Sequence, residues 1–161
     1  MSKTIGSWMK KGVISIGPEA TLLDAARLLA EKQIGTLPVV DKKGHLIGLT
    51  NIRKIVRFFL PDFINVMEDV DFVRDFGAID IPSPIDIKLA SHKTVEEIMD
   101  EPVSVEEKAS LMRALALMVT HDIPDIPVVR DGKLAGIASR VDIGRAFLHS
   151  WLDDLPKHKK R

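Results

Sequence analysis

Apolar residues recur every three to four positions over 21–32 and 110–121, and this period predicts two amphipathic helices. Thr21 stands where a helix N-cap would stand, and Asp24 follows three residues later, which is the spacing of a capping box. Short apolar runs separated by tight turns predict strands over 37–40, 46–50, 126–129 and 134–138. Further expected elements are helices over 51–60 and 140–155, short helices over 4–9 and 94–99, and a strand over 13–16.

The predicted elements occur twice in the same order. The run Pro-Val-Val appears at 38–40 and again at 127–129, and each copy is followed by a turn and a second strand. The offset between the copies is 90 at Met9/Met99 and 88 at Gly48/Gly136, and each one-residue change falls in a predicted turn. Register is therefore kept inside the elements, as expected of a duplicated supersecondary unit.

The ordered pattern has a Met closing a short first helix, a strand, an amphipathic helix and a hydrophobic-Pro-Val-Val strand. After these come an Asp/Gly turn and a strand ending in Gly-hydrophobic-x-Ser-x-x-Asp. This pattern resembles a tandem pair of cystathionine-β-synthase (CBS) domains, known together as a Bateman module. The resemblance implies an α/β (α+β) fold of two pseudo-twofold-related repeats, each a small sheet flanked by two helices. It also implies an adenine-containing ligand in the cleft between the repeats and further association, often as a disc-like dimer.

The expected organisation is a first CBS repeat over 1–60, an acidic helical insert and connector over 61–93, a second CBS repeat over 94–155 and a basic tail over 156–161. Within the insert, helical periodicity covers 62–76. Because Pro82 and Pro84 fall in 79–89, that stretch is predicted to be an extended connector.

Composition narrows the function classes. Lys plus Arg equals Asp plus Glu at 23 each, so the strongly basic balance typical of nucleic-acid binders is absent. The chain has no Cys, which excludes disulfides, thiolate catalysis and zinc–thiolate sites, and the five His residues show no metal-ligand spacing. No nucleophile is paired with a base, and no apolar run is long enough to span a bilayer. We expect a cytoplasmic, non-catalytic protein without a metal or a catalytic cofactor.

Ser139 and Asp142 carry the candidate chemistry. Their spacing fits a capping box at a helix start, and it also fits a hydroxyl and a carboxylate able to hold a sugar. An ionised carboxylate has two acceptor oxygens, so one Asp can accept both hydroxyls of a ribose. The family resemblance assigns ribose binding to Ser139 and Asp142, because this copy matches the Gly-x-x-Ser/Thr-x-x-Asp motif in full.

The first copy departs from that motif, with Asn51 in place of the hydroxyl residue and Lys54 in place of the carboxylate. An ammonium group has no acceptor, so it cannot receive the hydrogens of a diol. Arg53 and Lys54 could instead lie near the phosphate of a nucleotide held by Asp142, with Arg140 as a further candidate, or they form a solvated helix start. By resemblance, the base would be flanked by Val103, Ser104 and Val105 on one side and by Ile126 and Pro127 on the other, positions that also suit a plain core.

These observations favour a regulatory module that binds AMP, ADP, ATP or S-adenosylmethionine and modulates a partner protein. One alternative is a ligand-free interaction scaffold that uses the acidic 62–86 insert and a dimer face. Another is a nucleic-acid binder that acts through the basic residues at 157–161.

Overall fold

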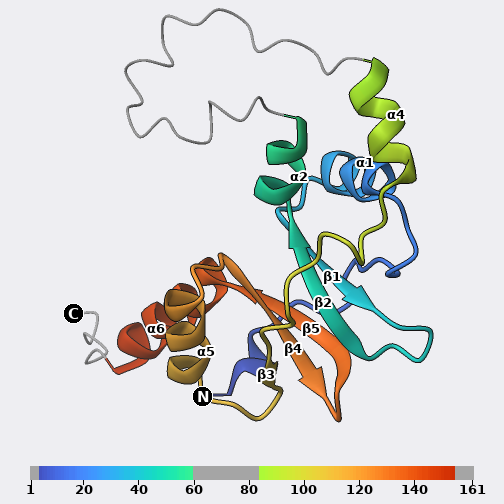
Figure 1. Ribbon diagram of the computed structural model, residues 1–161. Helices are drawn as coiled ribbons and strands as arrows, with labels where there is room; N and C mark the ends of the chain where they lie inside the picture. The colour runs from blue at the N-terminus through green and yellow to red at the C-terminus, as the bar shows by residue number, and fades with distance from the viewer. Residues whose placement is uncertain (1–3, 60–83, 155–161) are drawn as a thin grey trace, which may run out of the picture. The chain divides into compact units, whose positions relative to one another are not determined.

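The structure is a computed structural model that describes residues 4–59 and 84–154 (Figure 1). The helix predicted over 62–76 and the basic tail lie outside the described residues. The chain divides into two compact units that do not follow chain order. The first unit comprises Met1–Ile14, Val40–Ile47 and Glu101–Arg161, and the second comprises Ser15–Val39 and Gly48–Asp100.

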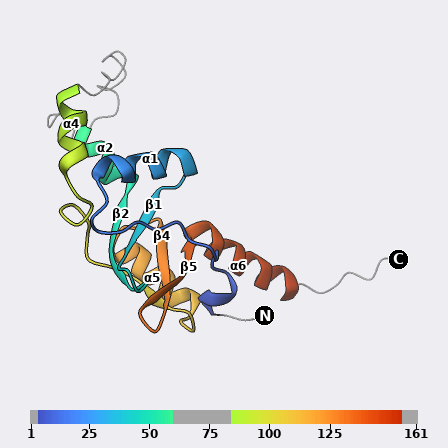
Figure 2. The same ribbon diagram turned by 90° about the vertical axis from the view of Figure 1, so that its right-hand side faces the viewer.

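The first unit is built on a three-stranded sheet in the order β3-β4-β5. Strand β3 (Val105–Glu106) is parallel to β4 (Asp125–Arg130), which is antiparallel to β5 (Lys133–Ser139). Helices α5 (Leu111–Thr120) and α6 (Arg140–Asp154) contact each other, and they pack on β4 and β5 respectively (Figures 1 and 2). The mixed helix and sheet class predicted from the sequence is confirmed.

The N-terminal segment completes the core of this unit. The predicted helix over 4–9 is a single 3-10 turn, η1 (Ile5–Ser7), and the Thr4 side chain makes no cap hydrogen bond. The backbone N–H of Ile5 donates to Ala109 O at 2.9 Å, so it is satisfied without a longer helix. The Ile5 side chain is fully buried among residues of the second repeat. The buried members of this core are Ile5, Val105, Leu111, Ala114, Met118, Ile126, Val128, Ala138, Ile143 and Ala146.

Strands β1 (Thr36–Val40) and β2 (Leu46–Asn51) pair with each other, and most of their residues belong to the second unit. This unit also packs three helices together. Helix α1 (Leu22–Lys32) contacts both α2 (Ile52–Phe59) and α4 (Pro84–His92) (Figure 1). The capping box predicted for Thr21 and Asp24 is confirmed, with reciprocal hydrogen bonds of 3.1 Å each. The extended connector predicted over 79–89 is wrong from Pro84 onward. Proline suits the first turn of a helix, where its missing N–H costs no hydrogen bond.

Two further predictions are corrected in the second unit. The strand predicted over 13–16 is a single bridge between Ile16 and Val39. The helix predicted over 94–99 is a turn, because the N–H groups of Val95 and Glu96 donate to the backbone of residues 18–20. Its predicted capping acid is nevertheless in place, since the Thr94 N–H donates to Glu97 Oε2 at 2.6 Å.

Candidate ligand-binding site

Strand β5 runs into helix α6 without a loop, and this junction positions Ser139 and Asp142. Ser139 ends the strand, and Asp142 lies in the first turn of the helix. The Asp142 N–H donates to Ser139 Oγ at 3.1 Å. In return the Ser139 N–H and hydroxyl donate to Asp142 Oδ2 at 2.9 and 2.8 Å. The capping-box interpretation of this spacing is therefore confirmed, and the ribose-binding interpretation stays a prediction.

Asp142 is a buried carboxylate, with 7% of the residue exposed. Burial is the largest single effect on its pKa and raises it, but the hydrogen bonds from Ser139 and the charge of Lys10 together hold the pKa below its usual value. Asp142 is therefore ionised at neutral pH. Oδ2 takes both bonds from Ser139, whereas Oδ1 accepts none from the part of the chain that the structure describes. The buried group thus keeps acceptor capacity for an incoming hydroxyl.

Lys10 is a site residue that the sequence reasoning missed. Its ammonium lies 3.6 Å from Asp142 Oδ2, and its side chain is 68% exposed. The backbone of Lys10 is fixed by reciprocal hydrogen bonds with Ile137 on β5, at 2.8 and 3.0 Å. A signal was present in the aligned repeats, in the corresponding stretches 9–11 and 99–101, here called the lead-in segments. The first lead-in segment has Lys10 where the second has Asp100, and the helix starts have Lys54 in the first copy and Asp142 in the second.

Arg140, expected as a phosphate ligand, contacts the end of α5. Its Nη2 donates to Met118 O at 3.3 Å and lies 3.6 Å from Asp122 Oδ1. These contacts tie the start of α6 to the preceding helix, so Arg140 has a structural role whether or not it also meets a ligand.

The five residues expected to flank a base lie in the same unit as Asp142. The side chains of Val105 and Ile126 are buried in the hydrophobic core, and Pro127 is also buried. Val103 is partly buried and packs against that core, and Ser104 is half-buried. A base could therefore meet Val105 and Ile126 only through their backbone atoms.

Arg53 and Lys54 belong to the second unit, so their approach to a phosphate near Asp142 stays a prediction. Asn51 Oδ1 accepts a 2.9 Å hydrogen bond from the Lys54 N–H, so this copy also caps its helix. The Lys54 ammonium forms an ion pair with Asp100. The cation that replaces the family carboxylate thus has a carboxylate partner of its own.

Comparison with known proteins assigns the class. The sequence model of the CBS domain matches residues 5–61 and 95–149, which together make up more than half of the chain. The chain therefore belongs to the CBS domain family and carries a tandem pair of these domains, as its internal repeat predicted.

Individual relatives agree with this assignment. Over 120 residues the chain is 30% identical to uncharacterized protein YlbB of Bacillus subtilis strain 168, covering 74% of this chain and 66% of YlbB. Inosine-5'-monophosphate dehydrogenase of Staphylococcus aureus strain Mu50 is 27% identical over 144 residues, where the match covers 86% of this chain and 24% of the enzyme. The chain thus spans about two thirds and about a quarter of the lengths of these two relatives.

Solved structures confirm the fold. CBSX2 from Arabidopsis thaliana is a CBS-pair protein that superposes with a TM-score of 0.73 at 25% identity, covering 94% of this chain and 99% of CBSX2. The crystal structure of CBSX2 in complex with AMP has a TM-score of 0.68 at 26% identity, covering 92% of this chain and 98% of that chain. In the described residues, no helix is both long enough and apolar enough to cross a membrane.

Proposed function

We propose that this protein is a regulatory module that binds one adenosyl ligand per chain at Asp142 and modulates a partner protein in response. The observation that carries the proposal is the buried Asp142 carboxylate, which is held by Ser139 through one oxygen while the other remains available. A ribose diol needs such an acceptor, and a charged hydrogen bond of this kind contributes about 1.5–3 kcal/mol. The AMP complex of CBSX2 supports the ligand class.

Lys10 favours a phosphorylated ligand among the adenosyl candidates. Its ammonium lies 3.6 Å from Asp142 Oδ2 and is exposed, so it would add positive charge to the surroundings of a ligand held by that carboxylate. A phosphate would gain from that charge, whereas the sulfonium and ammonium of S-adenosylmethionine would be repelled. AMP, ADP and ATP are therefore preferred to S-adenosylmethionine in this proposal.

Isothermal titration calorimetry with AMP and 2'-deoxy-AMP tests the diol contact. We expect 2'-deoxy-AMP to bind at least tenfold more weakly than AMP, because one hydroxyl that donates to the carboxylate is missing. We expect Asp142→Asn to remove measurable binding of both nucleotides. Equal binding of both nucleotides to the unaltered protein would exclude a ribose role for Asp142.

Asp24→Asn is the matched control. Asp24 caps α1 through Thr21 with the same three hydrogen bonds that Asp142 makes to Ser139, at 3.1, 2.7 and 3.1 Å. Both variants should be less thermally stable than the unaltered protein, to a similar extent, but only Asp142→Asn should lose AMP binding. Loss of AMP binding in both variants would point to general destabilisation rather than to a ribose contact.

The expected homodimer is supported by apolar residues exposed on the two helices of the first unit. Val119 on α5 and Val141 on α6 are 66% and 68% exposed, and Trp151 and Leu152 on α6 are 64% and 63% exposed. A second copy of the chain would cover this face, as dimerisation through paired helices removes apolar surface from water. Light scattering should report twice the chain mass for the unaltered protein and a single chain for Trp151→Asp. A monomeric unaltered protein would contradict the dimer.

A further inference from the structure

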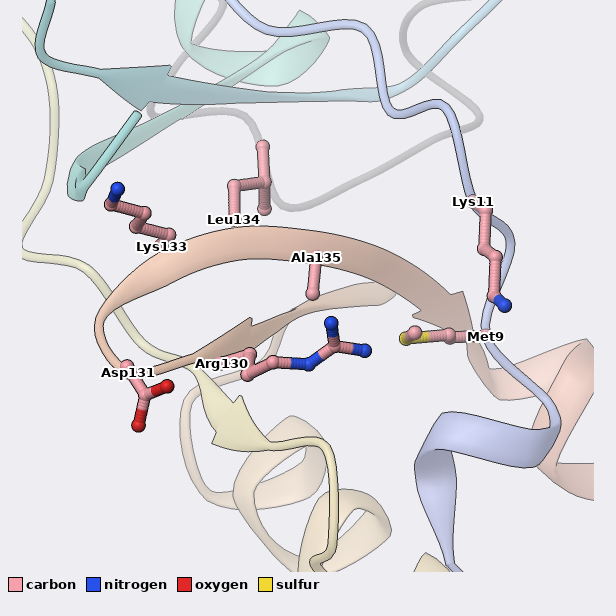
Figure 3. A pocket seen from close by; sticks show the side chains of 7 residues that line it. All are labelled: Met9, Lys11, Arg130, Asp131, Lys133, Leu134 and Ala135. Carbon is pink, nitrogen blue, oxygen red and sulfur yellow. The ribbon is translucent and has the colours of Figure 1, made fainter. Parts of the chain in front are cut away.

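A cavity lies in the first unit, between the N-terminal segment and the β4–β5 hairpin. Its volume is about 520 Å³, within the range of small-molecule sites. The lining residues are Met9, Lys11, Arg130, Asp131, Lys133, Leu134 and Ala135, and Asp142 is not among them. Figure 3 shows the side chains of Met9 and Arg130 directed toward each other on the side of β5 where Ala135 points.

The wall formed by β5 is shaped by a β-bulge. Val128 pairs with Gly136 and Val129 pairs with Leu134, so Ala135 is the extra residue between two paired positions. Beside it, Met9 packs so closely on Gly136 that a Cβ there would overlap the Met9 sulfur. The Ala135 methyl and the Met9 thioether thus form a fixed apolar side of the cavity, and bulges commonly re-aim side chains in this way.

Of the other lining residues, Lys11, Arg130 and Lys133 are cationic, Asp131 is the single acid and Leu134 is apolar. The guanidinium of Arg130 is fixed by a fork to Glu107, in which Nε and Nη2 donate to Oε2 and Oε1 at 2.6 and 2.9 Å. That fork leaves the Nη1 hydrogens for another acceptor. Within the described residues, neither Lys11 nor Lys133 has an acid within 4.0 Å.

The first repeat lacks every feature that makes this cavity cationic. By the alignment of the two copies, Lys11 corresponds to Glu101, Arg130 to Asp41, and Lys133 to His45. The small Ala135 corresponds to the larger Ile47. A CBS repeat therefore folds with acids and a bulkier side chain at these positions, so the fold does not require the cationic lining or the small Ala135.

We propose that this cavity binds a small organic phosphate, with the phosphate at Arg130 and Lys11 and an apolar body against Met9 and Ala135. A guanidinium already oriented by a carboxylate fork loses little freedom when it meets a phosphate. The apolar wall distinguishes such a ligand from inorganic phosphate, which has no apolar group to place there. The site is independent of the proposed nucleotide function.

Heteronuclear NMR on the full-length ¹⁵N-labelled chain, with phenyl phosphate as the probe, tests the proposal. We expect saturable shifts of the Lys11 and Ala135 amides, with phenyl phosphate binding at least tenfold tighter than phenol and tighter than inorganic phosphate. Lys11→Glu and Ala135→Ile each introduce the residue that the first repeat has at that position. Each should weaken the binding of phenyl phosphate at least tenfold. Lys108→Glu makes the same charge change at an exposed position outside the lining and should have less than a threefold effect.

Asp142→Asn separates this site from the nucleotide site and should leave phenyl phosphate binding unchanged. Loss of binding in Asp142→Asn, or persistence of binding in both Lys11→Glu and Ala135→Ile, would overturn the proposal. So would a single-stranded oligonucleotide that binds tighter than phenyl phosphate and responds to the same two variants. If Ala135→Ile changes amide shifts outside the cavity, that variant has disturbed the fold, and Lys11→Glu then decides the outcome. Lys11 is exposed, so its replacement should leave the fold intact.

Discussion

The two repeats make the same contact with opposite charges. In the first unit, Lys10 of the lead-in segment pairs with Asp142 in the first turn of α6. In the second unit, Asp100 of the lead-in segment pairs with Lys54 in the first turn of α2. Either polarity joins a lead-in segment to a helix start, but only an acid on the helix can accept the hydrogens of a diol. The duplicated scaffold therefore tolerates the exchange, whereas the proposed ligand chemistry does not.

The exchange also distinguishes correct from incorrect pairing of the lead-in segments. Each segment adds a bridge to a strand, Lys10 to Ile137 and Asp100 to Leu49. If the segments changed places, Lys10 would meet Lys54 and Asp100 would meet Asp142. Both encounters place like charges together, so the charge pattern disfavours that alternative.

The largest loss of stability should come from substitution of a glycine that both repeats share, the one against which the Met of the lead-in segment packs. A Cβ on Gly136 would overlap Met9 Sδ and lie 3.0 Å from Lys10 O, and on Gly48 it would overlap Met99 Sδ and lie 3.2 Å from Asp100 O. Gly136→Ala should lower the free energy of unfolding in urea by about 2 kcal/mol, and Gly48→Ala by somewhat less. Gly17→Ala, which meets no atom within 4 Å, should be nearly neutral. If all three variants matched, the lead-in segments would not be docked as described.

The next largest change in stability concerns the helix caps. The pH dependence of stability should differ between the two copies, because Asp142 can ionise and Asn51 cannot. Hydrogen bonds lower the folded pKa of Asp142, so its stabilisation is complete above the unfolded pKa of about 3.9 and is lost as pH falls through the folded pKa. Asp142→Asn should cost about 1 kcal/mol at pH 7, and this gap should shrink at pH 3. The urea-unfolding free energy of each variant, measured from pH 7 to pH 3, checks this.

Asn51→Ala is the control from the other copy. Asn51 caps α2 through the Lys54 N–H, so its removal should also cost about 1 kcal/mol. Because the amide does not titrate, the loss should be the same at every pH. A constant loss for Asp142→Asn as well would mean that its carboxylate does not gain from ionisation in the folded state.

A smaller effect is expected at the buried end of β2, where Thr50 corresponds to Ala138 of the second copy. Thr50 is fully buried, and its Oγ1 has no hydrogen-bond partner among the described residues. Thr50→Val should therefore raise the free energy of unfolding by about 0.5–1 kcal/mol, because an unsatisfied hydroxyl is replaced by a methyl group. Thr50→Ser keeps the hydroxyl and removes the methyl, so it should be destabilising. Stabilisation by both variants would indicate overpacking rather than an unsatisfied polar group.

Local features were predictable from the sequence, and contacts between distant segments were not. The caps at Thr21/Asp24 and Ser139/Asp142 follow from spacing within one helical turn, and the repeat located the paired strands. The burial of Ile5 in the second repeat depends on a segment about 100 residues away in the chain, and no periodicity reports such a contact. Helix α4 was missed because a proline was interpreted as a break, although Pro84 can occupy the first turn. Lys10 was not predicted because an alignment of the repeats matches identical or similar residues. The Lys10–Asp142 and Asp100–Lys54 pairs occupy the same positions but carry opposite charges.

The smallest effect tests that exchange directly at Lys54 and Asp100. The Lys54 and Asp100 side chains are 33% and 59% exposed, so solvent and salt screen the pair and its contribution should be a few tenths of a kcal/mol. Lys54→Asp places two acids together and should destabilise slightly. Adding Asp100→Lys gives the polarity of the first unit and should restore stability. A double-mutant cycle in urea, at low and at high salt, measures the coupling. If the coupling vanishes even at low salt, the two charges do not interact, and only Lys10 and the more buried Asp142 would favour the correct pairing of the lead-in segments.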